Sequence, residues 1–276
     1  MQGLAIYDVD RHHPANALLY GQDPATIFMT SAINLWQLGA CDRSRARSRE
    51  GLLLADRFSH AFSRGFLLCG VAWNYVQMRD HAGAERVSER VIQIAREHGF
   101  ANLLAWGGVL HGAAVAGQGR LDEGIAQMTG ARAGWHAGGA EVNGCFFACL
   151  LAEACLAAGR ADEAKAWVDQ ALREVPQKEE RNWWAEVHRL KGEILCRGGA
   201  PAGEVASRLE QAQAIARAHG ARSLELRAAM SLARLASKRG ARAGARQRLA
   251  QLYGGFTEGL DTPDLAAARE LLAELG

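Results

Sequence analysis

Several residues and patterns are scarce or missing in this sequence of 276 residues. Proline occupies only five positions, which suits packed helices. No Gly-x4-Gly-Lys-Ser/Thr stretch is present, and this excludes a P-loop nucleotide site. No apolar run of about 18 residues occurs, so we expect no membrane-spanning helix. The N-terminus has no basic start followed by an apolar run, so we also expect no signal peptide.

The cysteines show no spacing typical of a disulfide framework. They occupy six positions inside helical patterns, at 41, 69, 145, 149, 155 and 196. Cys145 and Cys149 are one helical turn apart, but their neighbours are apolar, which favours core packing over a metal site. Unpaired buried cysteines suit a reducing compartment, so we expect a cytoplasmic protein with neither a metal nor a cofactor.

Charge gives no sign of a polyanionic partner. The formal net charge is +2, too near neutral for bulk attraction to nucleic acid or to a membrane, so we expect neither as a partner. The arginines at 43, 45, 47 and 49 fall on two sides of a helix and do not form one patch. No serine, histidine and acid can be tied into a catalytic set, so we predict that the chain is not an enzyme.

The dominant positive feature is a repeated helix–turn–helix pattern. One copy runs from Leu151 to Ala164 with Gly159 at its turn. Similar turns recur near Gly39, Arg79, Gly119, Gly199 and Gly240. The small residues seven positions before each turn are 40 or 41 residues apart, at Ala32, Ala72, Gly112, Ala152, Gly192 and Ala233. The residues after each turn keep the same period, and only one is bulky: Ser44, Ala84, Gly124, Ala164, Val205 and Ala245.

Two small residues at a fixed separation across a turn allow two antiparallel helices to approach closely. A period of this length predicts an all-α solenoid of about six helix pairs. We expect the helices at 24–38, 42–56, 60–78, 82–98, 101–117, 121–137, 142–158, 161–175, 181–197, 203–219, 222–239 and 242–253. A further helix after Pro263 carries an apolar stripe and would cap the sixth pair. We assign 1–22 to an N-terminal segment and 23–276 to the solenoid domain.

The fourth pair resembles the tetratricopeptide (TPR) family. Its pattern of Ala148-x2-Leu151-Ala152-x2-Cys155, followed by Ala164-x3-Val168 and Pro176, tracks the TPR consensus with weaker aromatic positions. The usual TPR period is about 34 residues. The longer period of this chain implies that the second helix of each pair, or the segment that leaves it, is longer than in a usual TPR.

A narrower resemblance covers nearly the whole chain. It is carried by the segments LYGQDP at 19–24, RLKGE at 189–193, SLELRAAMSLARL at 223–235 and YGGFTEGLDT at 253–262. These segments are similar to the C-terminal TPR-like region of large bacterial signalling proteins. There the region follows an ATP-binding domain, which often follows an adenylate cyclase or another output domain. The resemblance implies a regulatory role, and the ATPase and cyclase parts have no counterpart in this sequence.

In TPR-like folds the first helix of each pair lines the concave face. Counting six and three positions back and one and four positions on from the small residue of each first helix gives the positions on one side of that helix. The predicted face is apolar and aromatic in its first half and charged in its second. Its candidate partner-binding or ligand-binding residues are Trp36, Phe66, Trp73, Trp106, Phe146, Arg189, Glu193, Arg227 and Arg234. Aromatic and arginine anchors are favoured in binding hot spots. Alternatively, tight curling of the first four pairs or the N-terminal segment buries the apolar positions.

Two functions fit this pattern. The first is a non-enzymatic interaction or regulatory module that binds a protein or peptide in the concave groove. Its partner could be a separately encoded ATPase or cyclase, and pairing with a second copy of the chain is left open. The second is a small-molecule sensor domain of an ATP-dependent bacterial regulator, because an aromatic-lined cavity suits a small ligand.

Overall fold

The computed structural model describes residues 8, 10–12, 28–139, 142–178 and 181–276. Every element of regular secondary structure within these residues is a helix, which confirms the predicted all-α fold class. The first helices of the pairs are α3 (Phe28–Gln37), α5 (Ala61–Gln77), α7 (Ala101–Gly117), α9 (Gly144–Ala157), α11 (Trp184–Arg197) and α13 (Arg222–Lys238). The second helices are α4 (Cys41–Arg57), α6 (His81–His98), α8 (Leu121–Ala137), α10 (Ala161–Lys178), α12 (Ala202–Ala218) and α14 (Arg242–Tyr253).

The predicted helix bounds agree with these bounds to within a few residues. The predicted start of the first helix at 24 and the N-terminal segment 1–22 lie almost entirely outside the described residues. Helix α10 continues to Lys178, past the end at 175 that Pro176 was expected to impose. A proline near the end of a helix removes few backbone hydrogen bonds, so it need not stop the last turn. A short 3₁₀ segment, η2 (Arg181–Trp183), precedes α11.

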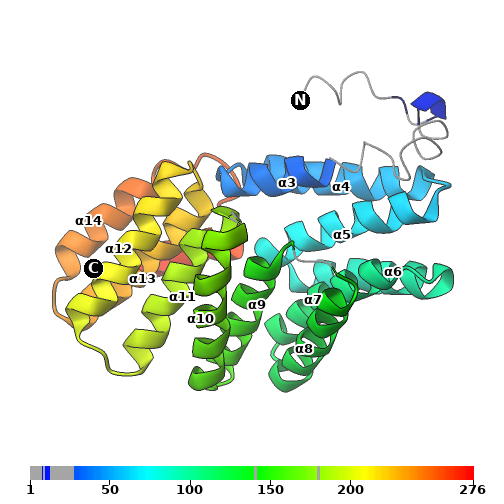
Figure 1. Cartoon of the computed structure of the whole chain (residues 1–276). Helices are drawn as coiled ribbons and strands as arrows, with labels where there is room; N and C mark the ends of the chain where they lie inside the picture. Colours follow the sequence, from blue (N-terminus) through cyan, green and yellow to red (C-terminus); the bar gives the residue numbers. More distant parts are fainter. Residues whose placement is uncertain (1–7, 9, 13–27, 140–141, 179–180) are drawn as a thin grey trace. The chain divides into compact units, whose positions relative to one another are not determined.

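The chain divides into two compact units. Unit 1 comprises residues 1–36 and 41–141, and unit 2 comprises 37–40 and 142–276. In unit 1, consecutive helices from α4 to α8 pack in chain order, and α5 also contacts α7 (Figure 1). In unit 2, helices α9 to α14 pack in the same way, with α11 contacting both α9 and α13. Odd-numbered helices therefore lie next to each other within each unit, α5 with α7 in unit 1 and α11 with α9 and α13 in unit 2, as expected of a solenoid of helix pairs.

Small residues stand where the helices of a pair cross. Gly112 and Gly124 face each other so closely that a Cβ on Gly112 would lie 2.8 Å from the carbonyl oxygen of Gly124. In the first pair, Ser44 takes the second position and donates a hydrogen bond of 2.8 Å to the carbonyl of Ala32. Both alanines of the fourth pair, Ala152 and Ala164, are fully buried. The register read from the sequence therefore marks the helix crossings.

The turns also fall where the repeat predicts them. Positive φ angles occur at all six predicted turn positions: Gly39 (82°), Arg79 (61°), Gly119 (93°), Gly159 (76°), Gly199 (72°) and Gly240 (77°). Glycine adopts this left-handed conformation without the steric cost that a Cβ imposes, and Arg79 is the exception that bears that cost.

The last helix, α15 (Pro263–Glu274), packs against α13 and α14 within unit 2. It buries Leu265, Ala268 and Leu271 against them. The predicted capping helix is therefore present at the end of the sixth pair. Among the residues that the structure describes, no helix combines the length and the apolar character needed to cross a membrane.

Candidate functional site

Aromatic side chains of unit 1 gather on α5, α7 and α8 into an aromatic cluster of Phe66, Trp73, Trp106 and Trp135. The Trp106 ring centroid lies 5.4 Å from Phe66, 5.9 Å from Trp73 and 5.9 Å from Trp135, with each pair edge-to-face. Trp106 is 4% exposed, and its indole N–H has no hydrogen-bond acceptor among the described residues. Phe66 and Trp73 are only partly buried, so they are the members that a partner can reach.

Two other aromatic candidates lie in the protein core. Trp36 is 2% exposed and Phe146 is 1% exposed. In unit 2 the Phe146 ring lies 4.7 Å from that of Trp183, a residue that the sequence reading did not select. Their burial agrees with the alternative reading of the apolar positions, in which they pack inward. Contact with a partner stays a prediction for both residues.

The charged candidates of unit 2 meet in a buried ionic cluster. The Arg189 guanidinium donates two hydrogen bonds to the Glu186 carboxylate, at 2.9 Å and 2.6 Å. It also lies 3.8 Å from a carboxylate oxygen of Glu153 and 3.8 Å from one of Glu193. Burial alone would lower the pKa of Arg189, but the surrounding carboxylates raise it above its ordinary value. The expected pair with Glu193 is therefore secondary to the pair with Glu186.

Arg227 extends this cluster to the next odd-numbered helix. Its guanidinium lies 3.9 Å from Glu186 and donates a hydrogen bond of 2.8 Å to Asp264 on α15. Glu193 in turn accepts a hydrogen bond of 2.5 Å from the Ser231 hydroxyl. The cluster therefore joins side chains of α9, α11, α13 and α15.

Arg234 is the exposed member of the charged set. With Glu193 it lines a pocket of about 270 Å³ in unit 2, to which Ser231, Ser237, Lys238 and Glu274 also contribute. The pocket therefore presents two cationic side chains, two carboxylates and two hydroxyls. Such a lining suits a polar or zwitterionic group.

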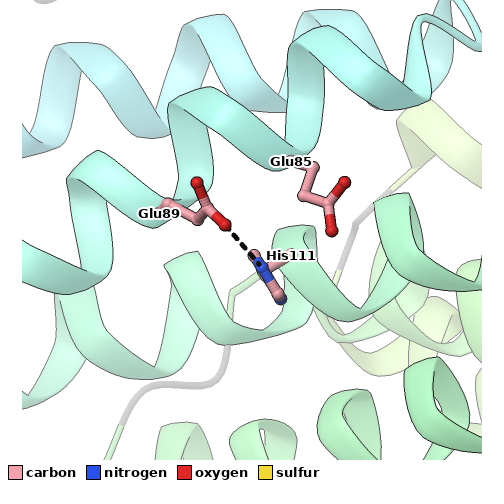
Figure 2. A group of neighbouring side chains, drawn as sticks. All are labelled: Glu85, Glu89 and His111. Carbon is pink, nitrogen blue, oxygen red and sulfur yellow. Dashed lines mark ion pairs between the residues drawn. The ribbon is translucent and has the colours of Figure 1, made fainter.

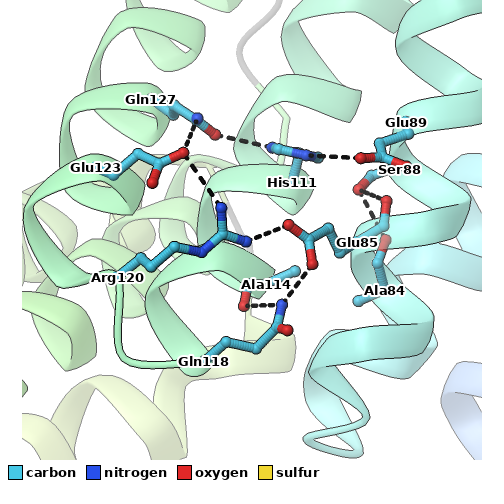
Figure 3. A network of polar contacts seen from close by, with 10 residues as sticks. All are labelled: Ala84, Glu85, Ser88, Glu89, His111, Ala114, Gln118, Arg120, Glu123 and Gln127. Atoms are coloured by element: carbon cyan, nitrogen blue, oxygen red, sulfur yellow. Dashed lines mark hydrogen bonds and ion pairs between the residues drawn. The ribbon is translucent and has the colours of Figure 1, made fainter.

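The sequence reading missed a polar network on α6, α7 and α8 of unit 1 (Figure 3). Glu85 pairs with Arg120 and accepts a hydrogen bond of 2.7 Å from Gln118. These bonds from Gln118 and Arg120 hold the pKa of Glu85 below its ordinary value. Arg120 also lies 3.5 Å from Glu123.

His111 connects the second half of this network. Its Nδ1 lies 2.8 Å from Gln127 Oε1, and its Nε2 lies 3.8 Å from Glu89 Oε1 (Figure 3). His111 and Glu89 also line a groove of about 860 Å³ between α6, α7 and α8, and Ala105 and Gly108 belong to its lining. The groove is lined mainly by apolar and small residues, and charged side chains such as Arg96 and Glu97 also contribute.

The cysteines take the positions expected of core residues. Cys145 and Cys149 are each 4% exposed, and no disulfide links any of the six cysteines, all of which the structure describes. Burial raises the pKa of the Cys69 and Cys149 thiols. A raised thiol pKa disfavours the reactive thiolate, so neither Cys69 nor Cys149 has the environment of a nucleophile.

Comparison with known proteins supports the fold and leaves the family open. No family model matches the chain. An uncharacterized protein of Rhizobium meliloti (strain 1021) is 27% identical over 234 residues, which is 84% of this chain but only 23% of that protein. The chain thus spans less than a quarter of the length of the relative that it matches. Its fold is similar to that of a Rap protein solved in complex with competence and sporulation factor. The TM-score is 0.63 at 9% sequence identity, with 90% of this chain and 73% of that chain covered.

Proposed function

We propose that the chain is a non-enzymatic helical-repeat module that binds a segment of a partner protein through side chains of its odd-numbered helices. The observation that carries this proposal is the exposure of aromatic side chains on such helices in unit 1 and of a cationic side chain on one in unit 2. Phe66 and Trp73 are partly exposed on α5, and Arg234 is exposed on α13. Large aromatic and arginine side chains contribute most to protein interfaces.

The similar fold of the Rap protein, which was solved with a bound factor, supports a binding role for this architecture. A cytoplasmic regulator with a separately encoded ATPase or cyclase as partner follows from the resemblance to TPR-like signalling regions. Arg189 and Arg227 already hold carboxylates of their own unit, so their part in the proposal is to keep the odd-numbered helices of unit 2 in place. Arg234 would contact acidic groups of the partner directly.

The test begins with co-purification from the native cell and continues with binding measured between the purified proteins. Phe66→Ala with Trp73→Ala, and separately Arg234→Glu, should each weaken binding by about tenfold or more. The matched controls lie on even-numbered helices: Leu53→Ala on α4, where Leu53 is 70% exposed, and Arg246→Glu on α14. Equal binding by the wild type and both odd-helix variants would refute the proposal.

The groove between α6, α7 and α8 favours a second candidate, a small-molecule sensor. Its volume of about 860 Å³ lies in the range of ligand pockets, and most of its lining is apolar. A metabolite that binds there should raise the melting temperature of the wild type by mass action. Leu104, which lines the groove and is 37% exposed, provides the test. Leu104→Glu should abolish the shift, whereas Leu53→Glu on another surface should retain it.

A further inference from the structure

Three side chains of the types that bind metal ions converge in unit 1, and two of them also line the groove (Figure 2). Glu85 and Glu89 are one turn apart on α6, and His111 faces them from α7. One ligand atom from each residue lies within 4.8 Å of the others. Glu85 and His111 are partly buried, so both are held by their surroundings, and Glu89 is the exposed member.

The neighbours of His111 determine which ring nitrogen faces the carboxylates. Gln127 donates from its Nε2 to Glu123 at 3.2 Å, so its carbonyl oxygen is the atom that lies 2.8 Å from His111 Nδ1. With this amide orientation Nδ1 carries the hydrogen, and in the corresponding neutral tautomer the Nε2 lone pair lies on the side of Glu89. A carbonyl oxygen on the far nitrogen is the arrangement that orients and strengthens metal-binding histidines.

The local charges are unbalanced. Glu85, Glu89 and Glu123 bring three carboxylates to this network, whereas Arg120 brings one guanidinium and pairs with Glu85 and Glu123, and Glu89 faces His111. Gln118 and Arg120 donate to different oxygens of Glu85, and each carboxylate oxygen has a second lone pair available for a further partner. A cation between Glu85, Glu89 and His111 would offset the excess negative charge. It would also bind the lone pairs of His111 Nε2 and Glu89 Oε1, which face each other.

The repeat supplies an internal comparison. Two periods later, the positions equivalent to Glu85, Glu89 and His111 are Lys165, Asp169 and Lys191. Asp169 there pairs with Lys165 at 2.7 Å and with Lys191 at 2.6 Å. In unit 2 the same three positions thus pair one acid with two bases, and the acid has opposite charges on both sides. In unit 1 they hold two acids and an imidazole.

We propose that Glu85, Glu89 and His111 bind a divalent first-row transition metal ion, with Zn²⁺ as the representative. Imidazole nitrogen and carboxylate oxygen are established ligands for this class of metal, and three protein ligands leave a coordination position open. Because Glu89 and His111 line the groove, the open position faces it and can accept water or an anionic group.

Isothermal titration of the untagged, reduced full chain with Zn²⁺ tests the site. The wild type should bind about one equivalent through these ligands, and His111→Gln should abolish this binding. Gln127→Leu removes no ligand but should weaken binding by about tenfold or more, because the imidazole loses its orienting carbonyl. Glu97→Gln is the control, since it removes the same charge from the same helix two turns away.

A triple variant uses the comparison within the repeat. Glu85→Lys, Glu89→Asp and His111→Lys together reproduce the triad of unit 2, so helical structure should be retained while the Zn²⁺ equivalent is lost. The His111→Gln result stands by itself if the triple variant does not fold. Identical Zn²⁺ isotherms for the wild type and His111→Gln, or no binding by the wild type at millimolar Zn²⁺, would overturn the proposal.

Discussion

Replacing Gly124 by alanine tests whether the small residues really set the helix crossings. A Cβ on Gly124 would collide with the carbonyl oxygen of Gly112 and lie 2.6 Å from the Ala116 backbone nitrogen. Backbone atoms cannot rotate away, so α7 and α8 must move apart. Overpacking of this kind costs up to about 3 kcal/mol, and the better helix propensity of alanine returns about 1 kcal/mol. We expect a net loss of about 2 kcal/mol in the free energy of unfolding.

Gly130 on the same helix provides the control. A Cβ there meets nothing within 4 Å, so Gly130→Ala should stabilise the protein by about 0.5–1 kcal/mol through helix propensity alone. Urea denaturation followed by circular dichroism measures both variants against the wild type. If Gly124→Ala proves as stable as Gly130→Ala, the close crossing does not exist and the role assigned to the small-residue register is wrong.

Two further predictions concern ionisable residues of unit 2. Arg189→Met leaves Glu186 buried without its bidentate partner and should cost about 3–5 kcal/mol in urea denaturation. Adding Glu186→Leu should recover part of that loss, and an equal or greater loss in the double variant would contradict the reasoning. Burial and the charge of Arg208 lower the pKa of His188 from 6.5 to about 4. Between pH 6.5 and pH 4, His188 therefore binds a proton in the unfolded chain but not in the folded chain. The free energy of unfolding should fall as the pH drops through this range. His188→Leu should reduce this loss of stability. Urea denaturation midpoints of the wild type and the variant at about pH 7 and pH 4.5 measure the loss. If the midpoint falls by the same amount in both proteins between the two pH values, His188 is not its cause.

Most of the fold could be predicted from the sequence because a solenoid relies on local and nearest-neighbour contacts. The period of small residues located Gly112 against Gly124, and the turn glycines located the positive φ angles. These signals depend on steric size alone, which each residue carries in its own identity. Helix ends were less predictable, as Pro176 shows, because the final turn of a helix depends on the chain that follows it.

Burial of the inner face could not be predicted in the same way. The register placed Trp106 and Arg189 on the first helices of their pairs, but both are almost covered by neighbours that the periodicity does not reveal. Trp135 of α8 packs against Trp106 of α7. Arg189 has an acid three positions before it, Glu186, and another four positions after it, Glu193, and the sequence alone does not show that Glu186 is the closer partner. The pattern gives the direction of a side chain, whereas its exposure depends on the sizes of all the residues around it.

The candidate metal ligands could have been found from the register, although the sequence reading did not find them. Glu85 follows the small residue Ala84, and His111 precedes the small residue Gly112. The same offsets two periods later give Lys165, Asp169 and Lys191, whose side chains pair with one another, so side chains at these offsets on neighbouring helix pairs lie close together.

This separation between crossing positions and adjacent positions has a consequence for function. The crossing residues are small at all positions but Val205, so they can carry little chemistry. The residues beside them are brought together equally well in each repeat, yet they are not constrained to one chemical type. An ion-paired triad and a set of candidate metal ligands can therefore occupy equivalent places without altering the stacking of the helices. The solenoid thus allows a site to arise by substitution at three positions, and a search for function in such a chain should compare equivalent positions between repeats.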